Sequence, residues 1–207
     1  MYLSRLTLNA RHNRTRSEFD RPYELHRTIC NAWGGDHEAA RILFRPEQDA
    51  PGVVTVIVQS LTKPDWSRLD APKEYLREVA GPKEVKLQGL VPGQHLRFRL
   101  RCSPSKRVGD RDDKDLGKRR ALGRRDEIFA WLQRKAKNSG FAVSEVAFDR
   151  VYWYHSKGGV QEKPLIGVVF EGELVVADPE KLRQALRNGI GPAKAFGFGL
   201  LSVAPAR

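Results

Sequence analysis

The chain of 207 residues has little sulfur, only two cysteines and one methionine, and it has no long uninterrupted apolar run. Cys30 and Cys102 lie far apart and belong to no C-x-x-C or H-E-x-x-H pattern, so neither a disulfide framework nor a zinc site is expected. A membrane helix needs about 20 consecutive apolar residues, and a secretory signal needs an apolar stretch near the start. Neither is found here, so we expect a cytoplasmic protein with no membrane partner.

Acidic residues are also in short supply, because 25 Asp and Glu stand against 37 Lys and Arg, which gives a net charge of +12. A hydrophobic fraction of 40% supplies enough apolar side chains for one or two packed cores, which argues against a disordered basic tail. A basic surface can meet acidic proteins or anionic membranes. Nucleic acid is the favoured partner, because a polyanion engages many cations at once.

The chain divides at the turn-forming segment Gly89–Gly93. In the first half, periodicity predicts strands at 2–8, 42–45 and 53–58, a basic loop at 10–21, a helix from Pro22 ended by Gly34, a short helix at 72–79 and an edge strand at 84–87. In the second half it predicts strands at 96–102, 141–148, 151–155, 165–170, 174–176 and 199–203, helices at 126–138 and 179–188, and a hairpin tip at 156–159.

The order β-α-β-β-α-β therefore occurs twice, with an extra hairpin in the second copy. This order predicts an α+β protein made of tandem ferredoxin-like domains with antiparallel sheets, residues 1–90 and 91–207. Many unrelated functions share that fold, so function has to be argued from individual residues.

The helix that begins at Pro22 carries the most informative residues. At 100° per residue, Leu25 and Ile29 fall in one arc, whereas Tyr23 and His26 share another, accessible face near the positive end of the helix dipole. These groups suit RNA cleavage by its own 2′-hydroxyl, in which one group removes the 2′-OH proton and another protonates the departing 5′-oxygen, with no metal or cofactor. The alternative is that both are ordinary surface residues of an amphipathic helix.

Four glycines crowd the segment before the last strand: Gly189, Gly191, Gly197 and Gly199. Glycine permits positive φ and a close approach of backbone amides, so this loop could cradle a phosphodiester. Ala193 precedes Lys194 where a Walker loop has glycine, so nucleotide triphosphate binding is not supported. The alternative is a glycine-rich helix end and connector.

Basic residues concentrate in the second half. Segment 105–125 holds nine Lys or Arg and four Asp, and alternation places three arginines on one face of the strand at 96–102. A loop that orders on an RNA backbone is compatible with a solvated loop in the free protein. The aromatic run Tyr152–His155 could stack on bases, although alternation puts part of it in the core. The candidate RNA-binding residues are Arg27, Arg97, Arg99, Arg101, Lys106, Arg107, Arg111, Lys118, Arg119, Arg120, Lys157 and Lys194.

Taken together, these segments resemble the CasE family of CRISPR precursor-RNA endoribonucleases, within the RAMP superfamily, over nearly the whole chain. The matching segments are Met1–Asn9, Arg21–Thr28, Leu61–Ser67, Gly93–Arg101, Phe170–Gly172, Val176–Pro179 and Gly189–Pro205.

The resemblance implies metal-independent cleavage at the 3′ base of a CRISPR repeat stem-loop. It implies 5′-hydroxyl and 2′,3′-cyclic or 3′-phosphate ends, and an enzyme that stays on its product as a subunit of Cascade. Tyr23 and His26 match the family's catalytic pair, and the four glycines match its glycine-rich loop. Some members carry a transition-state-stabilising lysine where this chain has Asn31, which leaves Arg27, Lys157 and Lys194 as candidates for that role.

Two other functions are consistent with the charge. A non-catalytic RNA-binding subunit of a ribonucleoprotein would bind tightly and give no product. A DNA-binding protein is less favoured, because no helix-turn-helix or basic zipper pattern occurs.

Overall fold

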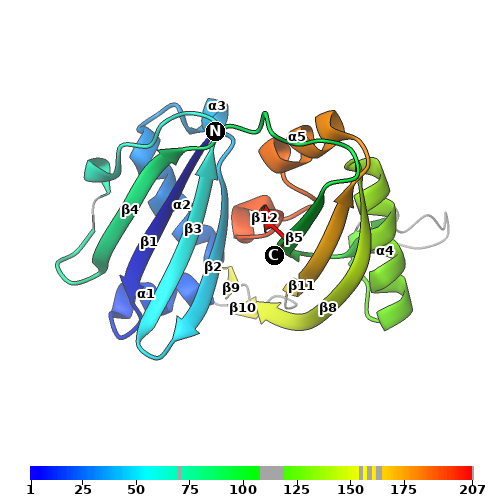
Figure 1. The fold of residues 1–207 in the computed structure, drawn as a ribbon. Helices are drawn as coiled ribbons and strands as arrows, with labels where there is room; N and C mark the ends of the chain where they lie inside the picture. The colour runs from blue at the N-terminus through cyan, green and yellow to red at the C-terminus, as the bar shows by residue number, and fades with distance from the viewer. Residues whose placement is uncertain (70, 108–118, 154–155, 158–159, 162–164, 207) are drawn as a thin grey trace.

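The computed structural model describes residues 1–69, 71–107, 119–153, 156–157, 160–161 and 165–206 (Figure 1). The first half consists of β1 (Tyr2–Asn9), α1 (Asn13–Asp20), α2 (Pro22–Cys30), the 3₁₀ helix η1 (Asn31–Trp33), α3 (His37–Ala40), β2 (Leu43–Ala50), β3 (Val53–Ser60), the 3₁₀ helix η2 (Trp66–Arg68) and β4 (Leu76–Glu84). Its four strands form one antiparallel sheet in the order β2-β3-β1-β4.

The second half consists of β5 (His95–Cys102), β6 (Ser105–Arg107), β7 (Arg119–Ala121), α4 (Arg125–Asn138), β8 (Phe141–Trp153), β9 (Ser156–Lys157), β10 (Val160–Gln161), β11 (Leu165–Val176), α5 (Pro179–Asn188), the 3₁₀ helix η3 (Lys194–Phe196) and β12 (Leu201–Pro205). Its main sheet is antiparallel, in the order β12-β5-β11-β8, and β6 with β7 and β9 with β10 form two small ribbons.

The predicted alternation and helical stripe build the first core. Leu6 of β1 pairs with Val56 of β3, and both are buried with Leu25 and Ile29 of α2. Full burial of each such side chain contributes about 1.5–3 kcal/mol. The helix predicted from Pro22 is therefore confirmed: α2 continues into η1, and Gly34, at φ 60°, follows its end.

The predicted basic loop at 10–21 is wrong, because most of it is helix α1. His12 caps this helix by accepting a hydrogen bond from the Arg14 backbone N–H at 3.2 Å. Glu18 faces inward and is 4% exposed, held by hydrogen bonds from Thr28, at 2.6 Å, and Tyr75. The buried, hydrogen-bonded carboxylate of Glu18 therefore anchors α1 to the rest of the first half. A glutamate is usually exposed, so the sequence alone did not predict this burial.

The predicted helix at 72–79 and edge strand at 84–87 are also wrong, because β4 occupies 76–84. Leu76 and Val79 have helical spacing, yet they lie opposite Leu8 and Leu6, which are only two residues apart. The β1–β4 register shifts between Thr7 and Leu8, so β4 accommodates one extra residue there. A bulge therefore gave a strand the spacing of a helix.

In the second half, the helices predicted at 126–138 and 179–188 are confirmed as α4 and α5. Asp178 caps α5 by accepting hydrogen bonds from the Glu180 and Lys181 backbone N–H groups at 3.1 Å. The strands predicted as four short pieces between 141 and 176 are instead two long strands, β8 and β11. The segment 105–125 is not only loop, since its described ends form the β6–β7 ribbon and the start of α4.

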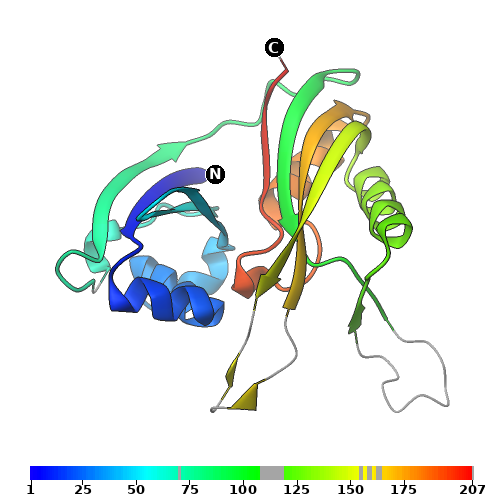
Figure 2. The same cartoon turned by 90° about the horizontal axis from the view of Figure 1, so that it is seen from below.

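The two sheets stand side by side with a core in each, and η3 of the second half projects toward the helices of the first (Figures 1 and 2). Buried polar contacts fix this arrangement. Arg45 Nη1 donates to Ser202 Oγ at 2.9 Å, and Gln59 Nε2 donates to the Leu186 carbonyl at 2.6 Å. Both side chains are buried, so a shift between the halves would leave polar groups unsatisfied. Within the described ranges, no helix is long and apolar enough to cross a membrane.

Candidate active site

The candidate site lies where α2 meets η3. Pro22 occupies the first turn of α2, and the buried Leu25 and Ile29 anchor its inner face. Tyr23 is 46% exposed, and its ring centroid lies 6.0 Å from that of His26, one turn along the helix. The structure therefore brings the two predicted catalytic side chains together on an accessible face.

His26 is held between an aromatic ring and a thiol. Its imidazole stacks on Phe44 of β2 at 5.9 Å, with the ring planes 13° apart, and its Nε2 lies 3.6 Å from Cys30 Sγ. Partial burial, with the charge of His37, lowers the pKa of His26, so the free protein favours the neutral imidazole. Burial raises the pKa of Cys30 to about 11, which keeps its thiol protonated near neutral pH.

The glycine-rich loop reaches the same place through η3. Phe196 lies 6.0 Å, centroid to centroid, from Tyr23, so the predicted loop and the predicted helix are neighbours although about 170 residues separate them. Gly197 has φ 78°, and a Cβ there would lie 2.9 Å from Pro46 Cδ and 3.1 Å from Phe44 Cε2. Glycine at 197 is therefore needed for close packing of this loop on β2.

Both elements that meet at the site carry a cation, Arg27 on α2 and Lys194 on η3. Arg27 is exposed and forms an ion pair with Glu24 at 3.2 Å. Lys194 is the first residue of η3. It is exposed, but the surrounding protein removes part of the hydration of its ammonium group. That desolvation and the charges of Arg41 and Lys135 lower the pKa of Lys194.

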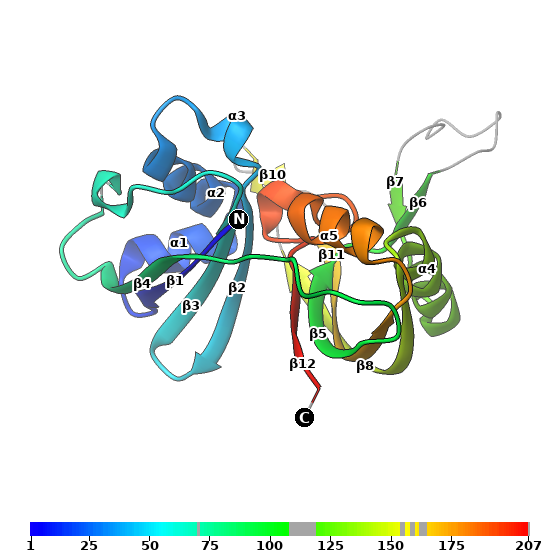
Figure 3. The same cartoon turned by 45° about the horizontal axis from the view of Figure 1, so that its top comes forward.

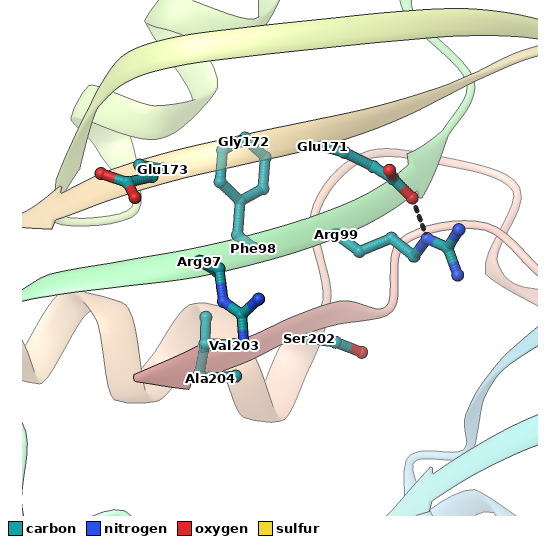
Figure 4. Close-up of a pocket in the computed structure, with 9 residues that line it drawn as sticks. All are labelled: Arg97, Phe98, Arg99, Glu171, Gly172, Glu173, Ser202, Val203 and Ala204. Atoms are coloured by element: carbon teal, nitrogen blue, oxygen red, sulfur yellow. Dashed lines mark hydrogen bonds and ion pairs between the residues drawn. The ribbon is translucent and has the colours of Figure 1, made fainter. Parts of the chain in front are cut away.

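The predicted row of arginines on β5 is divided between solvent and interior. Arg97 is exposed and Arg99 is half-exposed, paired with Glu47 at 3.0 Å and with Glu171. Figure 4 shows both on the sheet face that α4 and α5 do not cover, where a pocket of about 420 Å³ lies between β5, β11 and β12. Arg97 and Arg99 therefore remain at the protein surface.

The prediction of an exposed arginine row is wrong for Arg101, which is only 5% exposed. Its Nη1 donates to the Pro46 carbonyl at 2.9 Å, and its guanidinium lies 5.3 Å from the Phe198 ring centroid. Burial, followed by the charge of Arg45, lowers the pKa of Arg101 to about 10. Arg101 therefore ties the two halves together.

Sequence and fold comparisons relate the whole chain to known proteins. Residues 1–205 match the family described as "CRISPR associated protein". The CRISPR-associated endoribonuclease Cse3 of Thermus thermophilus is 40% identical over 223 residues, covering 99% of this chain and 100% of Cse3. The Cascade subunit CasE of Escherichia coli K12 is 33% identical over 191 residues, covering 88% of this chain and 92% of CasE.

The chain belongs to the Cse3/CasE family of CRISPR endoribonucleases. A solved structure of Thermus thermophilus Cse3, bound to an RNA representing a pre-cleavage complex, has a TM-score of 0.85 to this chain at 39% identity, covering 99% of this chain and 98% of that one. The Escherichia coli Cas6e crystal structure has a TM-score of 0.74 at 32% identity and covers both chains fully.

In this Cse3/CasE chain, the described ends of the basic segment 105–125 form the β6–β7 ribbon. Lys106 pairs with Arg120 and Arg107 with Arg119 across the ribbon, and all four side chains are exposed. Lys106 also contacts Glu127 of α4 at 3.0 Å. Arg111 and Lys118 lie outside the described residues, as do the side chains of Lys157 and of the aromatic run 152–155.

Sequence reasoning missed two residues of the site in this Cse3/CasE chain. Phe44 stacks on His26, and Phe196 packs beside Tyr23. Both lay inside segments that the sequence had assigned, one to a buried strand and the other to the glycine-rich loop. The Phe196 contact depends on how the two halves pack and the Phe44 contact on how β2 packs against α2, and periodicity reports neither. Among the described residues, no group of three or more His, Cys, Asp or Glu could hold a metal ion.

Proposed function

We propose that this chain cleaves CRISPR precursor RNA at the 3′ base of the repeat stem-loop and remains on the mature RNA as a Cascade subunit. The observation that carries the proposal is the Tyr23–His26 pair on α2, next to the η3 loop of the other half. Relatives described as a CRISPR endoribonuclease and as a Cascade subunit, together with the RNA-bound Cse3, support it.

In the proposed reaction the 2′-oxygen attacks the adjacent phosphorus and the bond to the departing 5′-oxygen breaks. This leaves a 2′,3′-cyclic phosphate on one fragment and a 5′-hydroxyl on the other. Tyr23 assists removal of the 2′-OH proton, and His26 protonates the leaving oxygen. Each such transfer typically contributes about 10²–10⁴-fold in rate.

For His26 to act as the acid, its imidazole must gain a proton when RNA binds. Burial disfavours the imidazolium in the free protein, whereas a phosphodiester beside the ring favours it. The stacked Phe44 and the Cys30 thiol hold the ring in one orientation during this change. RNA binding thus prepares the acid.

Charge that develops on the phosphate needs a cation close to the pair. Asn31 is exposed at the end of α2 and carries none, so we assign this role to Arg27 or Lys194, which come from α2 and η3. The exposed arginines of the β6–β7 ribbon and Arg97 would grip the RNA stem through its phosphates.

We also infer that the halves are two ferredoxin-like domains, residues 1–90 and 91–207. When the four strands of each main sheet are numbered in chain order, both sheets have the strand order 4-1-3-2, and each half has its own core. In the first domain the 3₁₀ helix η2 stands where the second helix is expected. Strand β4 ends at Glu84, and Leu87 and Leu90 already pack against the second core, so residues 85–90 link the two domains.

The test is incubation of the protein with its cognate repeat RNA in excess EDTA, followed by mapping of the fragment ends. The proposal predicts one cut at the 3′ base of the stem, with a 5′-hydroxyl on the downstream fragment. Tight binding without a cut would instead identify a non-catalytic RNA-binding subunit. A 5′-phosphate, or cutting that EDTA abolishes, would contradict the proposed chemistry.

A further inference from the structure

A polar groove of about 350 Å³ runs between α1 and α2. Helix α2 has α1 on one side and η3 on the other, so the groove lies on the face of α2 turned away from the second half (Figure 3). It is lined by Arg14 of α1, Arg21 between the helices and Arg27 of α2, together with Glu18 and Glu24. Ser17 and Asn31 add a hydroxyl and an amide at its wall.

Arg14 is fixed in position before any ligand arrives. Its Nε pairs with the buried Glu18 at 2.8 Å, and its Nη2 donates to Thr28 Oγ1 at 2.9 Å. The guanidinium lies 5.1 Å from the centroid of the Tyr75 ring, which adds a cation–π contact. Because Glu18 also accepts hydrogen bonds from Thr28 and Tyr75, its carboxylate is held at the bottom of the groove.

The other two arginines are available to an anion. Arg21 is exposed and its Nη2 donates to the neutral Ser17 Oγ at 2.6 Å, a contact that leaves its charge uncompensated. Arg27 has a side chain that is 67% exposed, and its pair with Glu24 is of the exposed kind, worth about 0–1 kcal/mol. A phosphodiester can therefore compete for both.

The position of the groove specifies which part of an RNA could reach it. Arg27 lies on the same helix as Tyr23 and His26, so the groove starts beside the cleavage site. In the proposed function the stem lies on the second half, and the strand continues past the cut, across α2. The α1–α2 groove shares Arg27 with this helix, so a strand that crosses α2 can enter it.

We propose that the α1–α2 groove binds the phosphodiester backbone of the single-stranded RNA on the 3′ side of the cut. This inference rests on the proposed function, and it adds a consequence. Apart from Arg27, which is also a candidate for contact with the scissile phosphate, the groove holds only the fragment that cleavage removes. It therefore increases affinity for the precursor more than affinity for the retained product.

The test uses two repeat RNAs made uncleavable by a 2′-deoxy nucleotide at the cut. One ends directly after the scissile phosphate, and the other continues for several nucleotides. We expect the wild-type protein to bind the longer RNA several-fold more tightly, and Arg21→Gln to remove that difference. The matched control is Arg77→Gln, since Arg77 is also exposed and bonded to a neutral side chain, Asn9 Oδ1 at 3.0 Å. It should retain the difference.

A second measurement is the salt dependence of binding to the longer RNA. Loss of one phosphate contact to a single strand should reduce the slope of log K against log salt by about 0.7 in Arg21→Gln. Equal wild-type affinity for both RNAs would overturn the proposed role of the groove. An equal loss of affinity for both RNAs in Arg21→Gln would overturn it as well. If the ribose-containing form of the longer RNA is cut while the affinities of the two uncleavable RNAs are equal, the groove fails and the proposed function stands. If that RNA is not cut, the proposed function fails, and the length dependence of binding still decides the groove.

Discussion

The two halves share one strand order but differ in where the helices between the first and second strands of their main sheets lie. In the first half α2 faces η3 and carries an uncharged tyrosine and a titratable histidine. In the second half α4 lies on the far side of its sheet, away from the first half (Figure 1). Strand order alone therefore does not position the predicted catalytic pair. Phe44 stacks on His26 from β2 of the same half, whereas the packing of the second half on the first brings Phe196 beside Tyr23.

The largest effect is expected when the proposed proton-transfer groups of the first half are removed. We expect Tyr23→Phe and His26→Ala each to slow cleavage by about 10²–10⁴-fold, because each removes one proton transfer. Affinity for an uncleavable repeat RNA should change little. Single-turnover cleavage and filter binding measure the two quantities. His95→Ala, at an exposed position of the second half, is the control, and normal cleavage by both site variants would refute their roles.

The next prediction loosens the contact between the halves. Arg45 is 5% exposed, pairs with Glu47 at 2.6 Å and reaches Ser202, so Arg45→Met should lower the free energy of unfolding by about 3 kcal/mol. Cleavage by the folded protein should fall as well, because η3 would no longer be held against α2. Denaturant titration with a cleavage assay checks both.

Arg68→Met is the matched control for Arg45→Met. Arg68 pairs with Asp65 at 3.1 Å, but its side chain is 60% exposed, so we expect a loss below about 1 kcal/mol. Equal losses in the two variants would mean that the contact between the halves does not depend on Arg45.

A smaller effect separates the two kinds of arginine on β5. Arg97→Gln should weaken binding of the repeat RNA several-fold, with a change in unfolding free energy within about 0.5 kcal/mol, because the side chain is exposed. Arg101→Gln should lower the unfolding free energy by about 1–3 kcal/mol, since it leaves the buried Pro46 carbonyl with a poorer donor. A larger loss of RNA affinity in Arg101→Gln, without destabilisation, would contradict this division.

The smallest effect concerns protonation. Because burial and the charge of His37 lower the pKa of His26, its imidazole is mostly neutral at pH 7 in the free protein. An uncleavable RNA should raise that pKa, since the phosphodiester favours the imidazolium. An NMR titration of the ring protons, with and without RNA, measures the change. A pKa that falls or stays constant would favour the exchanged roles, with His26 as the base.

The sequence could predict the elements whose apolar pattern is simple. The stripe of α2 identified its buried side, so the shared face of Tyr23 and His26 was predictable. Helix α1 was not, because Glu18 is buried only by virtue of distant partners such as Tyr75. Strand β4 was misassigned because a bulge gave Leu76 and Val79 the spacing of a helix.

The candidate site divides in the same way. Alternation correctly put Arg97, Arg99 and Arg101 on one face of β5, but it carries no information about what covers that face. Arg101 meets Pro46 of the other half, and Arg97 meets solvent. The stacking of Phe44 on His26 was likewise not predictable, because the apolar pattern of α2 carries no information about which residue of β2 packs against it.

We propose above that the first half cuts RNA with the RNA's own 2′-hydroxyl. The most direct measurement replaces that one hydroxyl by hydrogen at the scissile nucleotide and compares binding and cleavage with the unmodified repeat. We expect unchanged affinity and no product. A product formed from the 2′-deoxy RNA at the same position would contradict this expectation, because another nucleophile would then have attacked the phosphate.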